Sequence, residues 1–320
     1  MSGRDLAETM LSALIAYRFY VRGDSKIDIA EEFGISRFKV ARILESARGS
    51  GLVRVEFDLP VPVDVQLSDE VRSAFGLRRA FVLDRKASTG PRPEIRRHVG
   101  ALTARLVSEI VTETDVLGLA WARSVNAMAE SVRRLARCPV VQLCGVQAGM
   151  DMRDRSVETV RHVAAISGGD AYPIYGPLVL PDARTTDILR GQPGIAETFA
   201  QFGQLTKAVV SIGAWRPGES TVYDSLPPAD SEEIARRGAK AEVSGRLFDG
   251  EGKPMSTGLA HHVLAISTEE LFRVPELIAL GYTAPTAEAI RALLRSGLVS
   301  TLITDTGAAE PLLAHRATNA

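Results

Sequence analysis

A stretch of 20 residues, Lys26–Glu45, restricts the fold more than any other part of this 320-residue chain. Its apolar residues have the spacing of two short amphipathic helices that meet at Gly34, where glycine adopts a positive φ at little cost. Ala30 is small enough for the helices to cross closely, and Ser36 is a suitable N-cap for the second helix. The inward-facing positions are apolar: Ile29, Phe33, Ile35, Val40 and Ile43. Turn, cap and core agree at one register, which predicts a helix-turn-helix.

The second helix of this motif carries the local positive charge. Ser36–Arg48 holds four basic residues and one acidic residue, whereas residues 1–60 hold nine of each. A basic helix matches the major groove of duplex DNA, so we expect this helix to contact DNA. The residues expected to face the groove are Ser36, Arg37, Phe38, Lys39 and Arg42, with Arg37 and Arg42 on guanine or phosphate. The alternatives are a plain helical hairpin and a motif that contacts only protein.

The flanks of the motif extend the module. Apolar residues at 3–4 spacing predict a helix over Asp5–Tyr20, after which Gly23-Asp24 ends the helix and Ser25 can cap the next one. Beyond Gly49-Ser50-Gly51, the alternation of apolar and charged residues predicts a half-buried strand over Leu52–Leu59.

From Val65 onward, short apolar runs alternate with helical stretches. This pattern predicts an α/β fold with a doubly wound, mainly parallel sheet. Strands are expected over Ala80–Leu83, Val116–Ala120, Val140–Leu143, Ala208–Ile212, Leu259–Ile266 and Leu298–Thr304. Helices are expected over Ser68–Phe75, Arg92–Ile110, Val125–Arg137, Ser156–Ser167, Pro193–Gln204, Glu232–Arg237, Thr268–Arg273 and Thr286–Ser296. Because the chain exceeds the usual size of one core, we expect two domains, residues 1–60 and 61–320.

Composition places this chain among ordinary globular proteins. It is 45% hydrophobic and 24% charged, and its net charge of −1 requires that any DNA-binding charge be local. No run reaches the length of a membrane span, and Arg4, Asp5 and Glu8 are unlike a signal peptide, so we expect a cytoplasmic protein without a membrane partner. Cys138 and Cys144 are expected to be buried free thiols.

Three loops follow predicted strands and are therefore candidates for ligand binding. In Leu119–Val125, Ser124 can cap the next helix or donate its hydroxyl, Arg123 supplies a cation, and free helical N–H groups can hold an anion. Gln142–Gln147 contains Gly145, which permits close approach of a ligand, and Ser211–Trp215 is the third. The alternative interpretation is a simple cap, surface charge or turn in each loop.

Motifs for catalysis are absent from the sequence. There is no Walker loop, no GxGxxG after a strand and no GxSxG elbow. His261 and His262 fall in a predicted strand, so they would point to opposite faces, and no HxxxH or HExxH spacing occurs. We expect no metal, no cofactor and no catalytic residue.

In order and spacing, these pieces resemble the SorC family of bacterial sugar-responsive regulators, which is described together with the DeoR-like deoxyribose repressor and the central glycolytic gene regulator. The N-terminal resemblance lies in Ile29-Ala30, Phe33–Arg37, Val40, Ala47-Arg48 and Gly51–Val53. The remaining resemblance lies in Leu117–Trp121, Val140–Gly145, Ser211–Gly213, Gly245-Arg246, Asp249-Gly250, Ala289–Leu293 and Leu302–Asp305. It implies a sugar-isomerase-like α/β domain that binds an effector without turning it over.

The resemblance also implies an effector site, from which this chain departs at three places. Ala122 and Arg123 stand where the family has glycine and a small hydroxyl residue, Glu242 stands for an aspartate, and Thr286 stands for a phosphate-binding lysine. Losing that lysine removes a contact of roughly 1.5–3 kcal/mol. Either Arg123 replaces it, or the effector is an unphosphorylated sugar or polyol. The expected effector-binding residues are Trp121, Ala122, Arg123, Ser124, Gly145, Glu242, His262 and Thr286.

Together these features predict a homo-oligomeric regulator that binds operator DNA and a carbohydrate, polyol or sugar-phosphate effector. Two or more copies are needed because one small helix-turn-helix makes few contacts. The alternative is a sugar-phosphate-processing enzyme of the same α/β fold with an accessory N-terminal domain.

Overall fold

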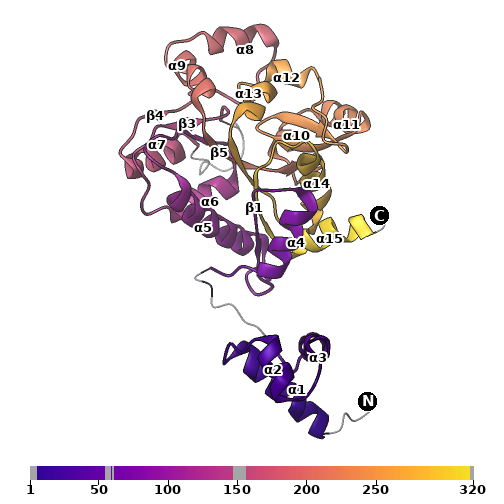
Figure 1. Ribbon diagram of the computed structural model, residues 1–320. Helices are drawn as coiled ribbons and strands as arrows, with labels where there is room; N and C mark the ends of the chain where they lie inside the picture. Colours follow the sequence, from indigo (N-terminus) through magenta and orange to yellow (C-terminus); the bar gives the residue numbers. More distant parts are fainter. Residues whose placement is uncertain (1–5, 55–58, 60, 147–155, 318–320) are drawn as a thin grey trace. The chain divides into compact units, whose positions relative to one another are not determined.

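The computed structural model describes residues 6–54, 59, 61–146 and 156–317 and divides into two compact units, Met1–Asp58 and Leu59–Ala320 (Figure 1). The described residues of the smaller unit form three helices, α1 (Leu6–Tyr20), α2 (Lys26–Glu32) and α3 (Arg37–Gly49). Ile15, Ile29, Val40 and Leu44 form its buried core.

Local side-chain chemistry fixes the ends of these helices. The Ser25 hydroxyl accepts from the N–H groups of Ile27 and Asp28, and the Asp28 carboxylate accepts from the Ser25 N–H, so α2 begins with a capping box. Gly34 makes the turn with a φ of 61°, and the Ser36 hydroxyl caps α3 by accepting from the Lys39 N–H. These observations confirm the predicted helix-turn-helix. Residues 52–54 form no strand, and half of the strand expected over 52–59, residues 55–58, lies outside the described residues.

The larger unit is built on a parallel seven-stranded sheet of order β1-β10-β9-β5-β2-β3-β4. Its strands are β1 (Arg79–Leu83), β2 (Leu117–Leu119), β3 (Val140–Gln142), β4 (Ala171–Tyr172), β5 (Lys207–Ser211), β9 (Glu276–Leu280) and β10 (Thr301–Asp305). A second, antiparallel sheet joins β6 (Gly213–Ala214), β7 (Ala239–Val243) and β8 (Arg246–Asp249).

Helices cover both faces of the large sheet (Figure 1). Apolar side chains of α5 (Arg92–Ile110), α6 (Arg123–Ser131) and α7 (Ser156–Ser167) form the core on one face, and those of α4 (Val65–Phe75), α14 (Ala287–Arg295) and α15 (Thr306–Ala317) contribute to the core on the other. The remaining helices are α8 (Ala183–Arg190), α9 (Ile195–Ala200), α10 (Thr221–Ser225), α11 (Pro228–Arg236), α12 (Leu259–His262) and α13 (Thr268–Arg273), with 3-10 turns at Phe202–Gln204 and Ala284–Thr286. The doubly wound, mainly parallel α/β fold is thereby confirmed.

One predicted strand is wrong. Leu259–Ile266 begins with helix α12, and only Val263 and Ala265 make isolated β-bridges. A short apolar run reads alike as a buried strand or a buried helix, so periodicity alone could not separate them. His261 and His262 are therefore consecutive residues of a helix and do not lie on opposite faces of a strand.

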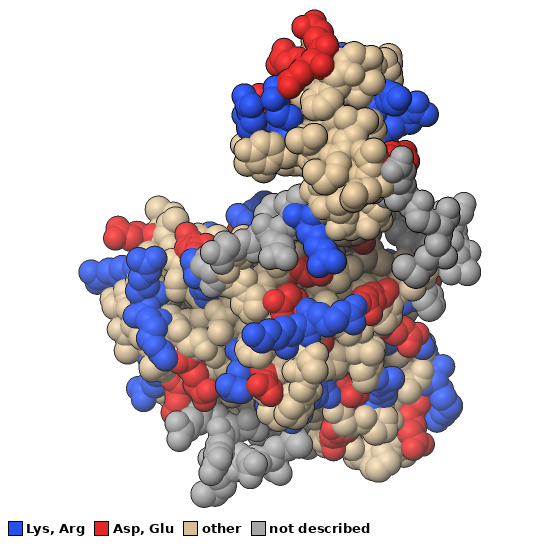
Figure 2. Space-filling view, turned by 90° about the horizontal axis from the view of Figure 1, so that it is seen from below, with Lys and Arg blue, Asp and Glu red and all other residues tan. Residues whose placement is uncertain are grey.

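The surface of the larger unit carries mixed charge. Figure 2 shows its Lys and Arg side chains interspersed with Asp and Glu over the face in view, in keeping with the net charge of −1. Among the described residues, no helix combines the length and the apolar character needed to cross a membrane.

Candidate functional site

Helix α3 presents a basic surface to solvent. Val40, Leu44 and Ala47 are buried beneath it. The five residues predicted to face DNA are all exposed: Ser36, Arg37, Phe38, Lys39 and Arg42. Phe38 is 82% exposed, and no acidic side chain among the described residues forms an ion pair with Arg37, Lys39 or Arg42. The surface therefore offers cations that pair with no acidic side chain in the part of the unit that the structure describes.

The larger unit contains a cavity of about 80 Å³ at the carboxyl ends of three neighbouring strands, β9, β5 and β2. Such strand ends are the usual ligand-binding edge of a parallel sheet. The cavity brings together six of the eight predicted effector-binding residues, namely Trp121, Ala122, Arg123, Ser124, Glu242 and Thr286. Further lining comes from α5, from residues 211–213 and 218–222, and from Cys144, Leu178, Ser244 and Tyr282.

The N-terminus of α6 forms one wall of this cavity. Ala122 occupies the N-cap position, and no side chain caps the helix. The expected capping role of Ser124 is therefore wrong, because Ser124 lies inside the first turn rather than in the extended residue before it. The Ser124 hydroxyl and the Trp121 Nε1 are both buried and have no hydrogen-bond partner among the described residues. The first turn of α6 and the two residues with unpaired donors thus line one small cavity.

Glu242 forms a second, acidic wall. Its carboxyl is buried and accepts from the Gly245 N–H (2.5 Å) and from the Ser220 hydroxyl (3.2 Å). Burial raises the pKa of Glu242, while these two hydrogen bonds act in the opposite direction. A Cβ on Gly213 would lie 2.8 Å from Oε2 of Glu242, so glycine leaves the space that this carboxylate fills.

Two arginines of α5 line the cavity and were not predicted as site residues from the sequence. Nη2 of Arg92 lies 2.7 Å from Oε2 of Glu219, and its guanidinium lies 5.7 Å from the centre of the Tyr282 ring. Nε of Arg96 donates to the Tyr282 hydroxyl at 3.2 Å. A signal was available, because cations in the first turns of a helix oppose its dipole and need another reason to be there.

The structure does not bring Gly145 and His262 to this cavity. A Cβ on Gly145 would lie 2.6 Å from the Pro177 carbonyl oxygen, so its glycine allows two backbone segments, rather than a ligand, to approach closely. His262 lies in α12, and its carbonyl accepts from the Leu180 N–H. Thr286 lines the cavity, but its hydroxyl donates to a backbone carbonyl, that of Tyr282 (2.8 Å) or Thr283 (2.9 Å). It cannot supply the positive charge of a lysine.

Comparisons with known proteins agree with this architecture. A family model described as "Putative sugar-binding domain" matches residues 60–314. The chain belongs to this sugar-binding family. This confirms the resemblance to SorC-type transcriptional regulators.

Relatives match this chain over most of its length. It is 26% identical over 303 residues to the uncharacterized transcriptional regulator YjhU of Escherichia coli, covering 92% of each chain. It is also 26% identical to the transcriptional regulator LsrR of Klebsiella pneumoniae, covering 98% of this chain and 95% of that one. The full-length sorbitol operon regulator SorC of Klebsiella pneumoniae shares its fold, with a TM-score of 0.71, 20% identity, and coverage of 96% and 99%.

Proposed function

We propose that this chain is a DNA-binding transcriptional regulator of carbohydrate or polyol metabolism, whose DNA affinity responds to a small sugar-like effector. The matching sugar-binding family and relatives that are named transcriptional regulators support it. In this proposal residues 1–60 bind DNA, and residues 61–320 bind the effector. Since the relatives are named as transcriptional regulators, we propose that the effector is bound without being turned over.

The DNA contact is assigned to α3. The exposed cations Arg37, Lys39 and Arg42 reach phosphates or base edges, and Arg37 and Arg42 are the residues we assign to guanine or phosphate. Since one such helix contacts few base pairs, two copies of the chain on a palindromic operator are needed, and the functional form is a homo-oligomer.

The effector is assigned to the cavity, and one observation carries that assignment. The Ser124 hydroxyl and the Trp121 Nε1 are buried donors with no partner among the described residues. Leaving a buried donor unpaired costs about 1–3 kcal/mol, so both are matched to hydrogen-bond acceptors of a ligand. Glu242, whose raised pKa favours the neutral form, and Ser220 beside it suit the hydroxyl groups of a sugar or polyol.

We further propose that this effector carries an anionic group. Three arginines line the cavity, Arg92, Arg96 and Arg123, against two glutamates. The free N–H groups at the start of α6 lie on the same wall as Arg123. These groups replace the family's lysine, whose place Thr286 occupies.

Calorimetric titration tests this assignment with matched compounds, D-glucitol and D-glucitol 6-phosphate, on the wild type and on Arg123→Ala. We expect the wild type to prefer the phosphorylated compound and Arg123→Ala to lose about tenfold of that preference, which corresponds to one charge-assisted contact. If both proteins prefer the phosphorylated compound by the same factor, Arg123 does not contact the phosphate. Steady turnover of a pentose or hexose phosphate by the purified protein would favour the enzyme alternative.

A further inference from the structure

One ion pair stands on the wall of the effector cavity itself. Arg92, the first residue of α5, contacts Glu219 in the loop between β6 and α10 at 2.7 Å, and both residues line the cavity. The Glu219 side chain is 15% exposed and that of Arg92 is 37% exposed. The Glu219 carboxylate therefore pairs with a guanidinium that an anionic ligand would need.

Arg92 is well placed to exchange one anion for another. Its guanidinium lies against the Tyr282 ring, whose hydroxyl accepts from Arg96, so the contact with Tyr282 helps to position the head group beside Glu219. The same planar donors fit carboxylate and phosphate alike. A ligand oxyanion and the Glu219 carboxylate thus compete for one set of donors.

Glu219 is also coupled to the rest of the cavity through its neighbours. Ser220, the next residue, caps α10 through the Tyr223 N–H (3.2 Å) and donates to Oε2 of Glu242 (3.2 Å). Gly218, the preceding residue, donates its N–H to Asp224 within α10 (2.9 Å). A shift of Glu219 therefore acts on α10 and on the Glu242 carboxyl together.

We propose that Glu219 is a built-in competitor for the anionic group of the effector. It holds Arg92 in the effector-free protein, and a polyhydroxyl compound with an oxyanion, either phosphate or carboxylate, displaces it and shifts residues 216–226. The inference rests on the proposed effector cavity. It deepens that proposal by assigning the ligand class and the segment that binding moves.

Fluorine NMR on the full chain labelled with 5-fluorotryptophan tests this inference. The two tryptophans report on both parts, because Trp121 lines the cavity and Trp215 packs on Tyr223 of α10 at 5.3 Å between ring centres. The Trp215→Phe variant assigns the two signals. Inorganic phosphate and acetate are titrated at constant ionic strength, which distinguishes a phosphate preference from a carboxylate preference.

We expect phosphate to shift both signals of the wild type. Glu219→Gln lowers the phosphate midpoint about tenfold, because a charge-assisted competitor is removed. Arg92→Gln raises that midpoint, and the double variant shows no gain over Arg92→Gln, since the effect of Glu219 passes through Arg92. The Trp215 signal of Glu219→Gln is already displaced before any phosphate is added.

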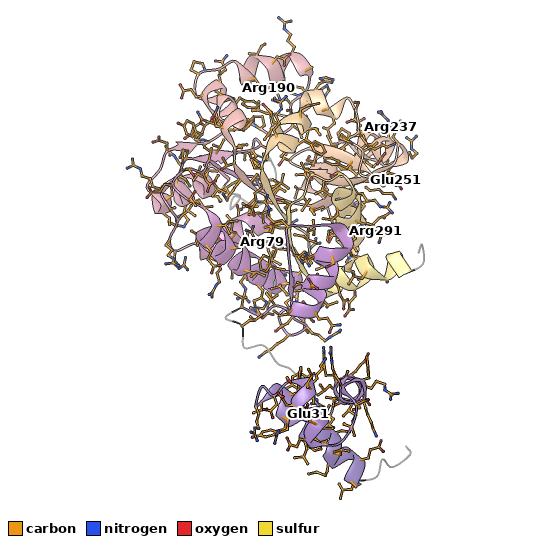
Figure 3. All side chains as sticks on the ribbon, viewed as in Figure 1. Glu31, Arg79, Arg190, Arg237, Glu251 and Arg291 are labelled. Atoms are coloured by element: carbon orange, nitrogen blue, oxygen red, sulfur yellow. The ribbon has the colours of Figure 1, made fainter. Side chains whose placement is uncertain are left out.

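Glu251→Gln is the matched control, because it removes the same charge from a surface pair with Arg295 (3.1 Å). Glu251 is labelled in Figure 3 and does not line the cavity. A phosphate midpoint of Glu219→Gln equal to that of the wild type overturns the competitor role while leaving the cavity as an anion site. Failure of phosphate and acetate to shift either tryptophan signal in any of these proteins overturns both this inference and the anionic effector site.

Discussion

The basic surface of α3 and the cavity of the larger unit both hold polar side chains that have no partner in the described part of the chain, but in opposite surroundings. On α3 the unpaired groups are exposed cations such as Arg37 and Arg42, which water solvates at little cost. In the cavity they are buried donors, Ser124 and Trp121, which lower the stability of the folded chain until something accepts from them. Mutations on α3 are therefore expected to weaken DNA binding without changing the stability of the fold. Mutations that remove a buried donor from the cavity are expected to weaken ligand binding and to stabilise the ligand-free protein.

The largest effect is expected on DNA. The double variant Arg37→Ala/Arg42→Ala should bind operator DNA about 100-fold more weakly, because two contacts of ~1–3 kcal/mol each are lost. Its salt dependence should fall and its melting temperature should stay unchanged, since neither side chain has an ion-pair partner among the described residues. Fluorescence anisotropy at several salt concentrations measures this. Arg22→Ala, which removes an exposed cation outside α3, is the control. Unchanged DNA binding in the double variant would show that α3 is not the recognition helix.

In the cavity, Ser124→Ala should weaken inorganic phosphate binding about tenfold and stabilise the ligand-free protein by about 1 kcal/mol, because it removes an unpaired buried hydroxyl. The phosphate titration and urea unfolding measure the two effects. Ser131→Ala is the control on the same helix, because its hydroxyl already donates to the Ala127 carbonyl (2.9 Å). Loss of stability in Ser124→Ala would show that the hydroxyl is satisfied within the protein.

A smaller effect tests how the N-terminal unit is built. Gly34→Ala should destabilise that unit by about 1 kcal/mol, because alanine is strained at a φ of 61°. Open space surrounds the added Cβ, so backbone strain is the whole cost. Hydrogen exchange of α2 and α3 amides in the full chain measures the change. Gly49→Ala also adds a Cβ in open space but at a negative φ, and should show no loss. Equal behaviour of the two variants would contradict the assigned turn.

The smallest effect concerns pH. Burial raises the folded-state pKa of Glu242 above its ordinary value of 4.5, so the folded chain binds this proton more tightly than the unfolded chain. The stabilising contribution is full below pH 4.5 and is lost as pH rises through the folded pKa. Relative to Glu242→Gln, the wild type should therefore lose melting temperature from pH 4.5 upward. If the melting temperatures of the two proteins change in parallel with pH over this range, the Glu242 carboxylate is in contact with water or a cation.

The two regions also differ in how far the sequence could predict them. Most of what the helix-turn-helix needs lies within 20 residues, because Gly34, Ser36 and the buried positions of α2 and α3 act on their immediate neighbours, while Ile15 of α1 completes the core. Caps and turns are local, so their residues can be recognised without the fold.

The cavity mixes local and distant contributions. The segment Trp121–Ser124 was predictable because it joins a strand to a helix. Glu219 and Arg92, in contrast, meet across 127 positions, a distance that no local pattern encodes. The small sheet was missed in part because the two-residue strand Gly213–Ala214 is too short to show a period. β7, by contrast, alternates apolar residues with Lys240 and Glu242, which is the pattern of a half-buried strand and was a usable signal.

The central claim is that a ligand in this cavity changes the affinity of α3 for DNA. The most direct measurement is fluorescence anisotropy of a duplex from upstream of its own gene, with each member of a panel of polyols, sugars, their phosphates and their acids. We predict that at least one anionic member changes the DNA affinity of the wild type and has no such effect on Arg92→Gln. A panel that never changes DNA affinity, or a compound that changes it equally in both proteins, would contradict the account.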